Sequence, residues 1–183
     1  NIKNFGEEIG KAIIEERKLH GKFESIEAFL ERIQHRNLNK KSMEALIMCG
    51  AFDSLGERGQ LLASLEALLQ FNKEVKQGDA SQGSLFDLLG GGPQNTLSLK
   101  ESAPAQLKQK LVWEKELLGL YISGHPLDRI REKLESRNIN IKKIKEEVGN
   151  GIPVTIGGII ESARQVITKN NERMVFLRIA DLT

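Results

Sequence analysis

The stretch Asn39–Gly56, NKKSMEALIMCGAFDSLG, carries the strongest structural pattern in this sequence. Apolar residues recur at steps of three and four through its first half, which predicts a helix from Lys40 to Met48. Residues 49–52, CGAF, then predict a tight turn, because glycine accepts the backbone angles that a chain reversal needs. Asp53 or Ser54 is expected to cap the next helix. The stretch therefore predicts two helices joined by a short hairpin.

The segment Phe5–Ala12, FGEEIGKA, resembles the same arrangement near the start of the chain. Both segments resemble a helix-hairpin-helix, although Glu8 stands where the common pattern has a second glycine. A turn of this type aims the free N–H groups of the following helix at a phosphate without reading bases. Tandem copies commonly form a five-helix unit that holds duplex DNA by its backbone. The residues expected to contact DNA are Gly6, Lys11, Lys40, Lys41, Gly50, Ala51 and Arg58.

The rest of the chain changes character twice. Residues 1–72 predict four or five short helices, with one long helix running through the leucines of 61–69. Residues 73–104 are rich in Gly, Ser, Gln and Asn, which predicts a linker. Residues 105–150 return to a helical pattern, with one helix over 105–121 that Gly124 and Pro126 end and a second over 127–137 that Asp128 caps.

Residues 151–183 have the period of two that is typical of strands. Apolar residues flank the pair Gly157-Gly158, and a second apolar run over 175–179 follows a polar turn at 169–171. A β-hairpin is therefore expected, with a bulge or bend at the paired glycines. A bulge or bend of this kind can curl a sheet into a small barrel. Two strands cannot close one, so the remaining strands of the barrel are expected beyond Thr183. Because the chain also begins without Met, we expect it to be a piece of something longer.

Several motifs resemble one family in order. FESIEAFLER (23–32), MEALI (43–47), GAFDSLG (50–56), WEKELLG (113–119) and SGHPLD (123–128) are similar to the helix-hairpin-helix region of bacterial DNA polymerase III alpha subunits. The resemblance implies a DNA-directed DNA polymerase, a nucleotidyltransferase acting in DNA replication. It implies a catalytic domain before Asn1 that holds Mg²⁺, so that no catalytic residue, cofactor or metal is expected in this chain. It also implies that the strands begin an oligonucleotide-binding (OB-fold) barrel.

The predicted fold class is therefore mainly α followed by β. The predicted domains are a tandem helix-hairpin-helix unit at 1–72, a linker at 73–104, connecting helices at 105–150 and the start of an OB-fold at 151–183.

An apolar island interrupts the predicted linker. Residues 82–86, QGSLF, resemble the family's internal sliding-clamp-binding peptide. The resemblance implies that Gln82 bonds the rim of a pocket on the clamp while Leu85 and Phe86 bury apolar surface in it. An amphipathic turn that folds back on its own domain is the alternative.

Composition excludes several classes of site. Cys49 is the only cysteine, so no internal disulfide is possible, and the three histidines, His20, His35 and His125, show no zinc spacing. No apolar run is long enough to span a membrane and no signal peptide is evident, so a cytoplasmic protein is expected. Polymerase chemistry needs paired Asp residues for two Mg²⁺ ions, and no such pair is evident.

Three functions remain open. The first is a polymerase segment with duplex DNA, single-stranded DNA at the barrel, the sliding clamp and other replicase subunits as partners, and Phe176 is the stacking candidate on the strands. The second is a helical scaffold without DNA contact, which the balance of 10 basic and 10 acidic residues in the first 60 positions favours. The third is a repair glycosylase, which would need a catalytic Asp and an aromatic pocket for an extruded base.

Overall fold

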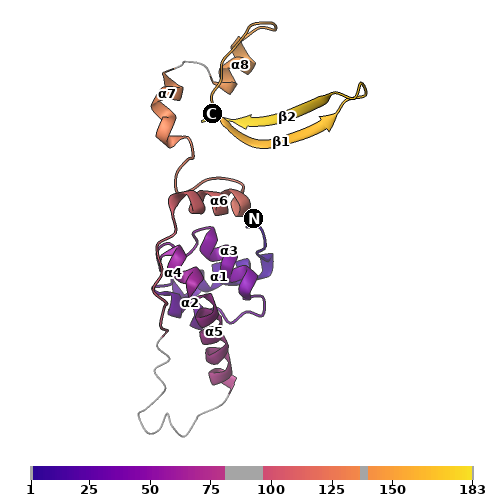
Figure 1. The fold of residues 1–183 in the computed structure, drawn as a ribbon. Coiled ribbons are helices and arrows are strands. Elements are labelled where there is room, and N and C mark those ends of the chain that lie inside the picture. Colours follow the sequence, from indigo (N-terminus) through magenta and orange to yellow (C-terminus); the bar gives the residue numbers. More distant parts are fainter. Residues whose placement is uncertain (1, 81–96, 137–139, 183) are drawn as a thin grey trace, which may run out of the picture. The chain divides into compact units, whose positions relative to one another are not determined.

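The computed structural model describes residues 2–80, 97–136 and 140–182 (Figure 1). The chain divides into two compact units, a helical unit (Asn1–Ser123) and a C-terminal unit (Gly124–Thr183). Helices make up the first unit, and the second holds short helices followed by a two-stranded sheet. The predicted class, mainly α followed by β, is confirmed.

The helical unit contains six helices among its described residues. Five of them lie within residues 7–80, as the tandem pattern predicts. The helix predicted from Lys40 to Met48 has these bounds in the structure. The apolar faces of the five helices meet in one core that includes Ile9, Phe29, Met43, Phe52 and Leu61, each buried. The helices are α1 (Glu7–His20), α2 (Ile26–Arg32), α3 (Lys40–Met48), α4 (Arg58–Ala63), α5 (Leu65–Ala80) and α6 (Leu107–Leu118).

The single helix predicted through 61–69 is two helices. α4 ends at Ala63 and its C-cap is Ser64, whose hydroxyl accepts a hydrogen bond from the Lys100 N–H at 2.8 Å; α5 then runs from Leu65 to Ala80. Leu97 and Leu99 pack against the core of the helical unit. The predicted linker at 73–104 is therefore too long at both ends. Its first residues belong to α5, and Leu97 and Leu99 near its other end pack on the core.

Helix α6 belongs to the helical unit, so the domain boundary expected near residue 105 falls after Ser123. α6 packs on α3, where Leu117 meets Ala45 and Cys49. The helix ends at Gly119, which has a φ of 77°, and not at the expected Gly124 and Pro126. A left-handed glycine is a common way to end a helix, because it lacks the Cβ that penalises this conformation.

The C-terminal unit begins with short helical segments in place of the single helix predicted over 127–137. Asp128 is the first residue of a 3-10 turn whose N-cap position is Leu127, and its carboxylate accepts a hydrogen bond from the His125 N–H at 2.6 Å, so the expected cap of a longer helix is not formed. The segments are η2 (Asp128–Ile130), α7 (Arg131–Glu135) and α8 (Ile141–Glu147).

The predicted β-hairpin is present, with corrected positions. β1 (Ile159–Ile167) pairs antiparallel with β2 (Arg173–Ala180), so the first strand starts later than the pattern at 154–160 indicated. The register shifts between Ile160 and Ser162, and not at Gly157-Gly158. Gly158 instead permits a close approach, because a Cβ there would lie 2.6 Å from the Ala180 carbonyl oxygen.

Two features of the described residues bear on function. None of the helices there is both long and apolar enough to cross a membrane. In the same residues, no three His, Cys, Asp or Glu side chains gather where they could hold a metal ion.

Candidate nucleic-acid interface

The second hairpin, residues 49–57 between α3 and α4, is closed by its own hydrogen bonds. The Gly50 N–H donates to the Ile47 carbonyl at 3.1 Å and the Ala51 N–H donates to the Leu46 carbonyl at 3.0 Å. This is the Schellman arrangement of a helix end, and it requires the left-handed φ of 84° that Gly50 adopts. The predicted turn is confirmed, and most of its N–H groups are used within the protein.

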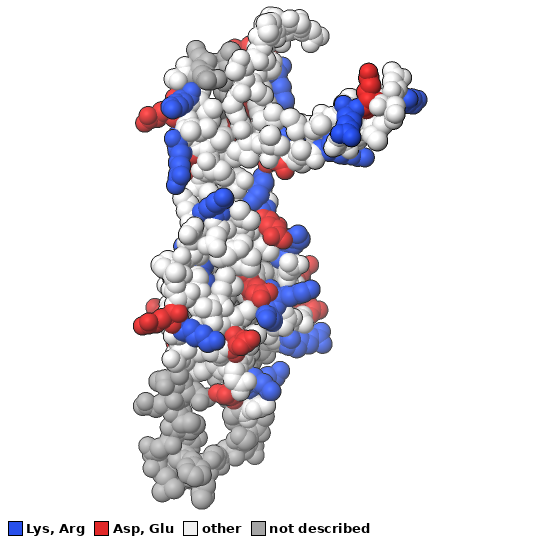
Figure 2. Space-filling model, viewed as in Figure 1, with Lys and Arg blue, Asp and Glu red and all other residues white. Residues whose placement is uncertain are grey.

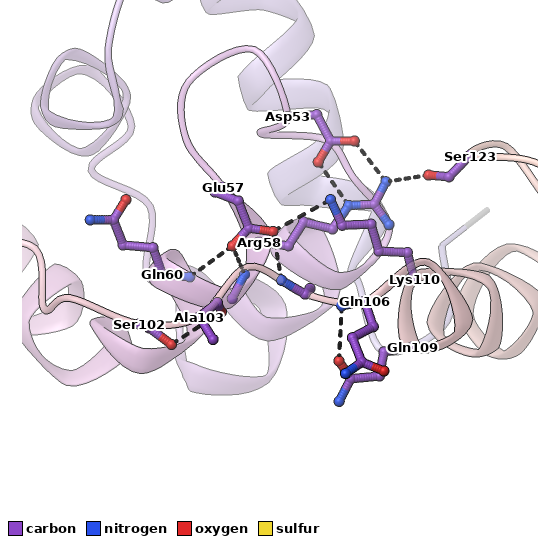
Figure 3. A network of polar contacts seen from close by, with 12 residues as sticks. Asp53, Glu57, Arg58, Gln60, Ser102, Ala103, Gln106, Gln109, Lys110 and Ser123 are labelled. Carbon is purple, nitrogen blue, oxygen red and sulfur yellow. Dashed lines mark hydrogen bonds and ion pairs between the residues drawn. The ribbon is translucent and has the colours of Figure 1, made fainter.

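Arg58 follows this turn and is buried, with 1% of its surface exposed. Its guanidinium donates two hydrogen bonds of 2.7 Å to the two carboxylate oxygens of Asp53 (Figure 3). It also donates to the Met48 carbonyl at 3.1 Å and lies 2.9 Å from a carboxylate oxygen of Glu114 on α6. The expectation that Arg58 contacts DNA is therefore wrong, because its charge is already neutralised inside the fold.

Glu114 is the other end of this ion pair and is fully buried. Burial would raise its pKa, but hydrogen bonds from the Ser123 hydroxyl, the N–H groups of Ser123 and Ile122, and Arg58 lower it to about 2. Glu114 therefore stays ionised and ties α6 to the second hairpin. Glu114 follows Leu111 by three residues, which is the spacing of one helix face, but no pattern in the sequence indicates its partner.

The N-terminus of α4 is occupied as well. Glu57, and not Asp53 or Ser54, is its cap, and one Glu57 carboxylate oxygen accepts from the N–H groups of Gly59 at 2.6 Å and Gln60 at 3.1 Å (Figure 3). Burial opposes the charge of Glu57, but these donors and the Ala105 N–H lower its pKa. A phosphate at this helix end would have to displace a carboxylate that the protein itself supplies.

The first hairpin, Asn4–Gly6 leading into α1, is open by comparison. Asn4 adopts a left-handed φ of 65°, and Gly6 precedes α1 without a side-chain cap. The first N–H groups of α1 therefore have no side-chain acceptor from the cap. Asn4 was missed by the sequence reasoning, although asparagine is among the residues that tolerate this conformation. Residues 2–5 form no helix ahead of this turn.

Charged side chains around the first hairpin carry both signs. Glu7 and Glu8 are exposed in the first turn of α1. Lys11 pairs with Glu7 at 2.7 Å, and Arg36 approaches Glu8 at 3.5 Å. Figure 2 shows basic and acidic side chains interspersed over the helical unit on the face in view.

The remaining expected DNA contacts are separated along α3. Lys40 and Lys41 are exposed in its first turn, while Gly50 and Ala51 follow its last turn. Ten residues of helical rise place them about 15 Å apart. The two lysines therefore do not flank the second hairpin in space. The residues expected to bind the clamp, Gln82, Leu85 and Phe86, lie outside the described residues.

Phe176 lies on β2 opposite Arg164 of β1 and is 57% exposed. Arg178 pairs with Ser162 two positions along the same face. The sheet thus presents an exposed aromatic ring beside two arginines.

Comparison with known protein families identifies a helix-hairpin-helix motif in this chain. A model of the helix-hairpin-helix motif matches residues 1–61, which include both hairpins. The match therefore covers the part of the chain that carries the candidate interface.

The whole chain is homologous to a segment of bacterial DNA polymerase III alpha subunits. It is 35% identical to DNA polymerase III subunit alpha of Thermus aquaticus over 186 residues, covering all of this chain and 15% of that relative. The same protein of Aquifex aeolicus is 36% identical over 183 residues, 14% of its length. That of Borreliella burgdorferi is 35% identical over 186 residues, 16% of its length.

Proposed function

We propose that this chain is the DNA-gripping and clamp-docking segment of a bacterial replicative DNA polymerase that acts in the cytoplasm. The observation that carries the proposal is similarity across the full chain to DNA polymerase III alpha subunits, with the helix-hairpin-helix match at its start. Nucleotidyl transfer and its Mg²⁺ ions belong, on this proposal, to other parts of the whole protein. The role of this segment is grip and processivity.

Duplex DNA is held by its backbone at the helical unit. Uncapped N–H groups at the start of α1 give the first hairpin the partial positive charge that attracts a phosphate. Lys11 lies one turn further along the same helix and adds a cation when DNA displaces Glu7 from it. Contacts of this kind do not depend on base sequence and weaken as salt rises.

The sheet is the beginning of an OB-fold that handles single-stranded template. An exposed Phe176 beside Arg164 and Arg178 suits a stacked base flanked by phosphates. Further strands would be needed to complete such a barrel, because two strands alone are marginally stable.

The sliding clamp docks on residues 82–86, and this part of the proposal has the sharpest test. Binding of the chain to a fluorescently labelled clamp is measured for the intact sequence and for a variant carrying Leu85→Ala and Phe86→Ala. The matched control carries Leu88→Ala and Leu89→Ala in the same apolar island. Loss of binding in the first variant alone supports the proposal, and equal behaviour of the two variants or no binding by the intact chain contradicts it.

A helical scaffold without DNA contact is the second candidate function, and the closed second hairpin favours it. The cap of α4 by Glu57 and the burial of Arg58 give that hairpin a packing role. Duplex binding by the intact chain at low salt separates the two functions. A scaffold would not bind, and a polymerase segment would bind with the same affinity for unrelated sequences.

A further inference from the structure

A hollow of about 260 Å³ opens beside the second hairpin, and Glu57, the cap of α4, is not among its lining residues. The end of α1, the loop that follows it and the turn itself all reach this hollow. Its lining residues are Ile13, Arg17, Lys22, Phe23, Phe29, Leu46, Ala51, Phe52, Ser54 and Leu55.

The floor of the hollow is rigid because it belongs to the core. Phe29 and Phe52 are buried and meet edge to face, with ring centroids 4.7 Å apart. Phe23 contacts Phe29 in the same way at 5.1 Å. Ala51 and Ser54 are exposed at the edge, so the hollow is continuous with the outer surface of the turn.

Two cations line the hollow and no acidic residue does. Arg17 has no acidic neighbour three or four residues away along α1, where Ile13, Ile14, His20 and Gly21 stand. The adjacent Glu16 is held by Arg32 at 2.9 Å, a hydrogen bond that lowers its pKa. Within the described residues neither Arg17 nor Lys22 forms an ion pair, so both charges are available to a ligand.

The turn adds hydrogen-bond donors at the same place. The N–H groups of Gly50, Ala51, Asp53, Leu55 and Gly56 bond to carbonyl groups within α3 and the turn. Among the described residues the Ser54 N–H has no such acceptor, and Ser54 is one of the residues that line the hollow. Two cations and a serine around an apolar floor match a phosphodiester, whose anion needs donors and whose sugar carbons need apolar contact.

We propose that this hollow is a contact site for the nucleic-acid backbone at the second hairpin, with Arg17 and Lys22 as its cations. The inference rests on the proposed DNA-binding function and refines it. The cations that serve the second hairpin come from the end of α1 and the loop after it, and not from Lys40, Lys41 or Arg58. The second hairpin thus keeps a DNA contact although the N-terminus of α4 is capped by Glu57.

The test measures binding of the full chain to a fluorescently labelled duplex by anisotropy over a range of salt concentrations. The variant carries Arg17→Ala and Lys22→Ala. The control carries Lys73→Ala and Lys76→Ala on α5, which removes the same charge from two exposed lysines. Because neither Arg17 nor Lys22 forms an ion pair within the described residues, circular dichroism and melting temperature should match those of the intact chain for both variants.

The expected result is a Kd that rises at least tenfold for the Arg17/Lys22 variant, with a salt slope that falls by about 1.8, the change for two lost phosphate contacts. Arg17→Lys in place of Arg17→Ala should recover part of the loss. Equal changes in the variant and the α5 control would overturn the inference while the proposed function stands. Failure of the intact chain to bind duplex at low salt would overturn both.

Discussion

The two hairpins of the helical unit resemble the same motif but have opposite environments. The second hairpin is locked from inside, because Gly50 closes the turn, Glu57 caps α4 and Arg58 is buried against Asp53 and Glu114. The first hairpin leads into a helix whose cap position, Gly6, supplies no side-chain acceptor. The presence of the motif therefore does not decide whether the N–H groups of its turn are free for a ligand.

The locked hairpin also explains how α6 is held. The Arg58 guanidinium donates to the Ser123 hydroxyl at 3.1 Å, across 65 positions of sequence, while Glu114 pairs with the same guanidinium. Breaking a buried ion pair leaves a buried charge without its partner, which costs more than an exposed pair is worth. The two hairpins should consequently differ in how much their charges contribute to stability.

The largest difference is expected on removing Arg58. Arg58→Met leaves Glu114 buried without its cation and should lower the free energy of unfolding by about 3–5 kcal/mol. The matched control is Arg36→Met, which removes an exposed pair with Glu8 near the first hairpin and should cost less than about 1 kcal/mol. Urea unfolding followed by the fluorescence of the single tryptophan, Trp113 on α6, reports this difference. Similar losses in both variants would mean that the second hairpin is not locked by this pair.

Acid should loosen the second hairpin selectively. The pKa of Glu114 is lowered to about 2, so its stabilisation is complete above the unfolded pKa near 4.5 and is lost as the pH falls from there toward 2. A lowering of this size corresponds to about 3 kcal/mol. Tryptophan-monitored unfolding free energies between pH 6 and pH 2.5 measure it. Glu114→Gln should flatten this part of the profile, and an unchanged profile in that variant would contradict the assignment.

The smallest difference in stability is expected between alanine substitutions at Gly50 and at Gly6. Gly50→Ala places a Cβ at a φ of 84° and against the Arg58 guanidinium, and should cost about 2 kcal/mol. Gly6 has an ordinary φ of −74°, and a Cβ there would lie 3.9 Å from its nearest neighbour on Ile9. Gly6→Ala should therefore change stability by less than about 0.5 kcal/mol. Melting temperatures of the two variants provide the comparison, and equal shifts would show that Gly50 is not strained by substitution.

Much of the fold was predictable where local pattern decides it. The bounds of α3, the turn at Gly50 and the antiparallel strands follow from apolar period and turn residues, and all three predictions are confirmed. Errors arose at ends and connections. The break at Ser64 depends on a hydrogen bond from Lys100, and the packing of Leu97 depends on a core that earlier helices build.

The residues of the candidate site likewise include some that the sequence predicts and some that only packing brings together. The hairpin residues Gly50 and Ala51 lie in the predicted turn, whereas the role expected for Arg58 is excluded by its burial. Arg17 and Lys22 are not among the DNA contacts predicted from the sequence, because no local pattern relates them to a turn some thirty residues later. Only packing of α1 beside that turn brings them to its hollow.

By itself the sequence determined the helices, the hairpin turns, the order of α and β parts and the likeness to one family of replicative polymerases. These features depend on residues close together in the chain, so the spacing of those residues in the sequence is enough to predict them. The tertiary structure alone decided which hairpin is open, which cations are free and which charge is buried. Those properties depend on partners such as Arg58 and Glu114, which lie far apart in sequence and meet only when the core forms.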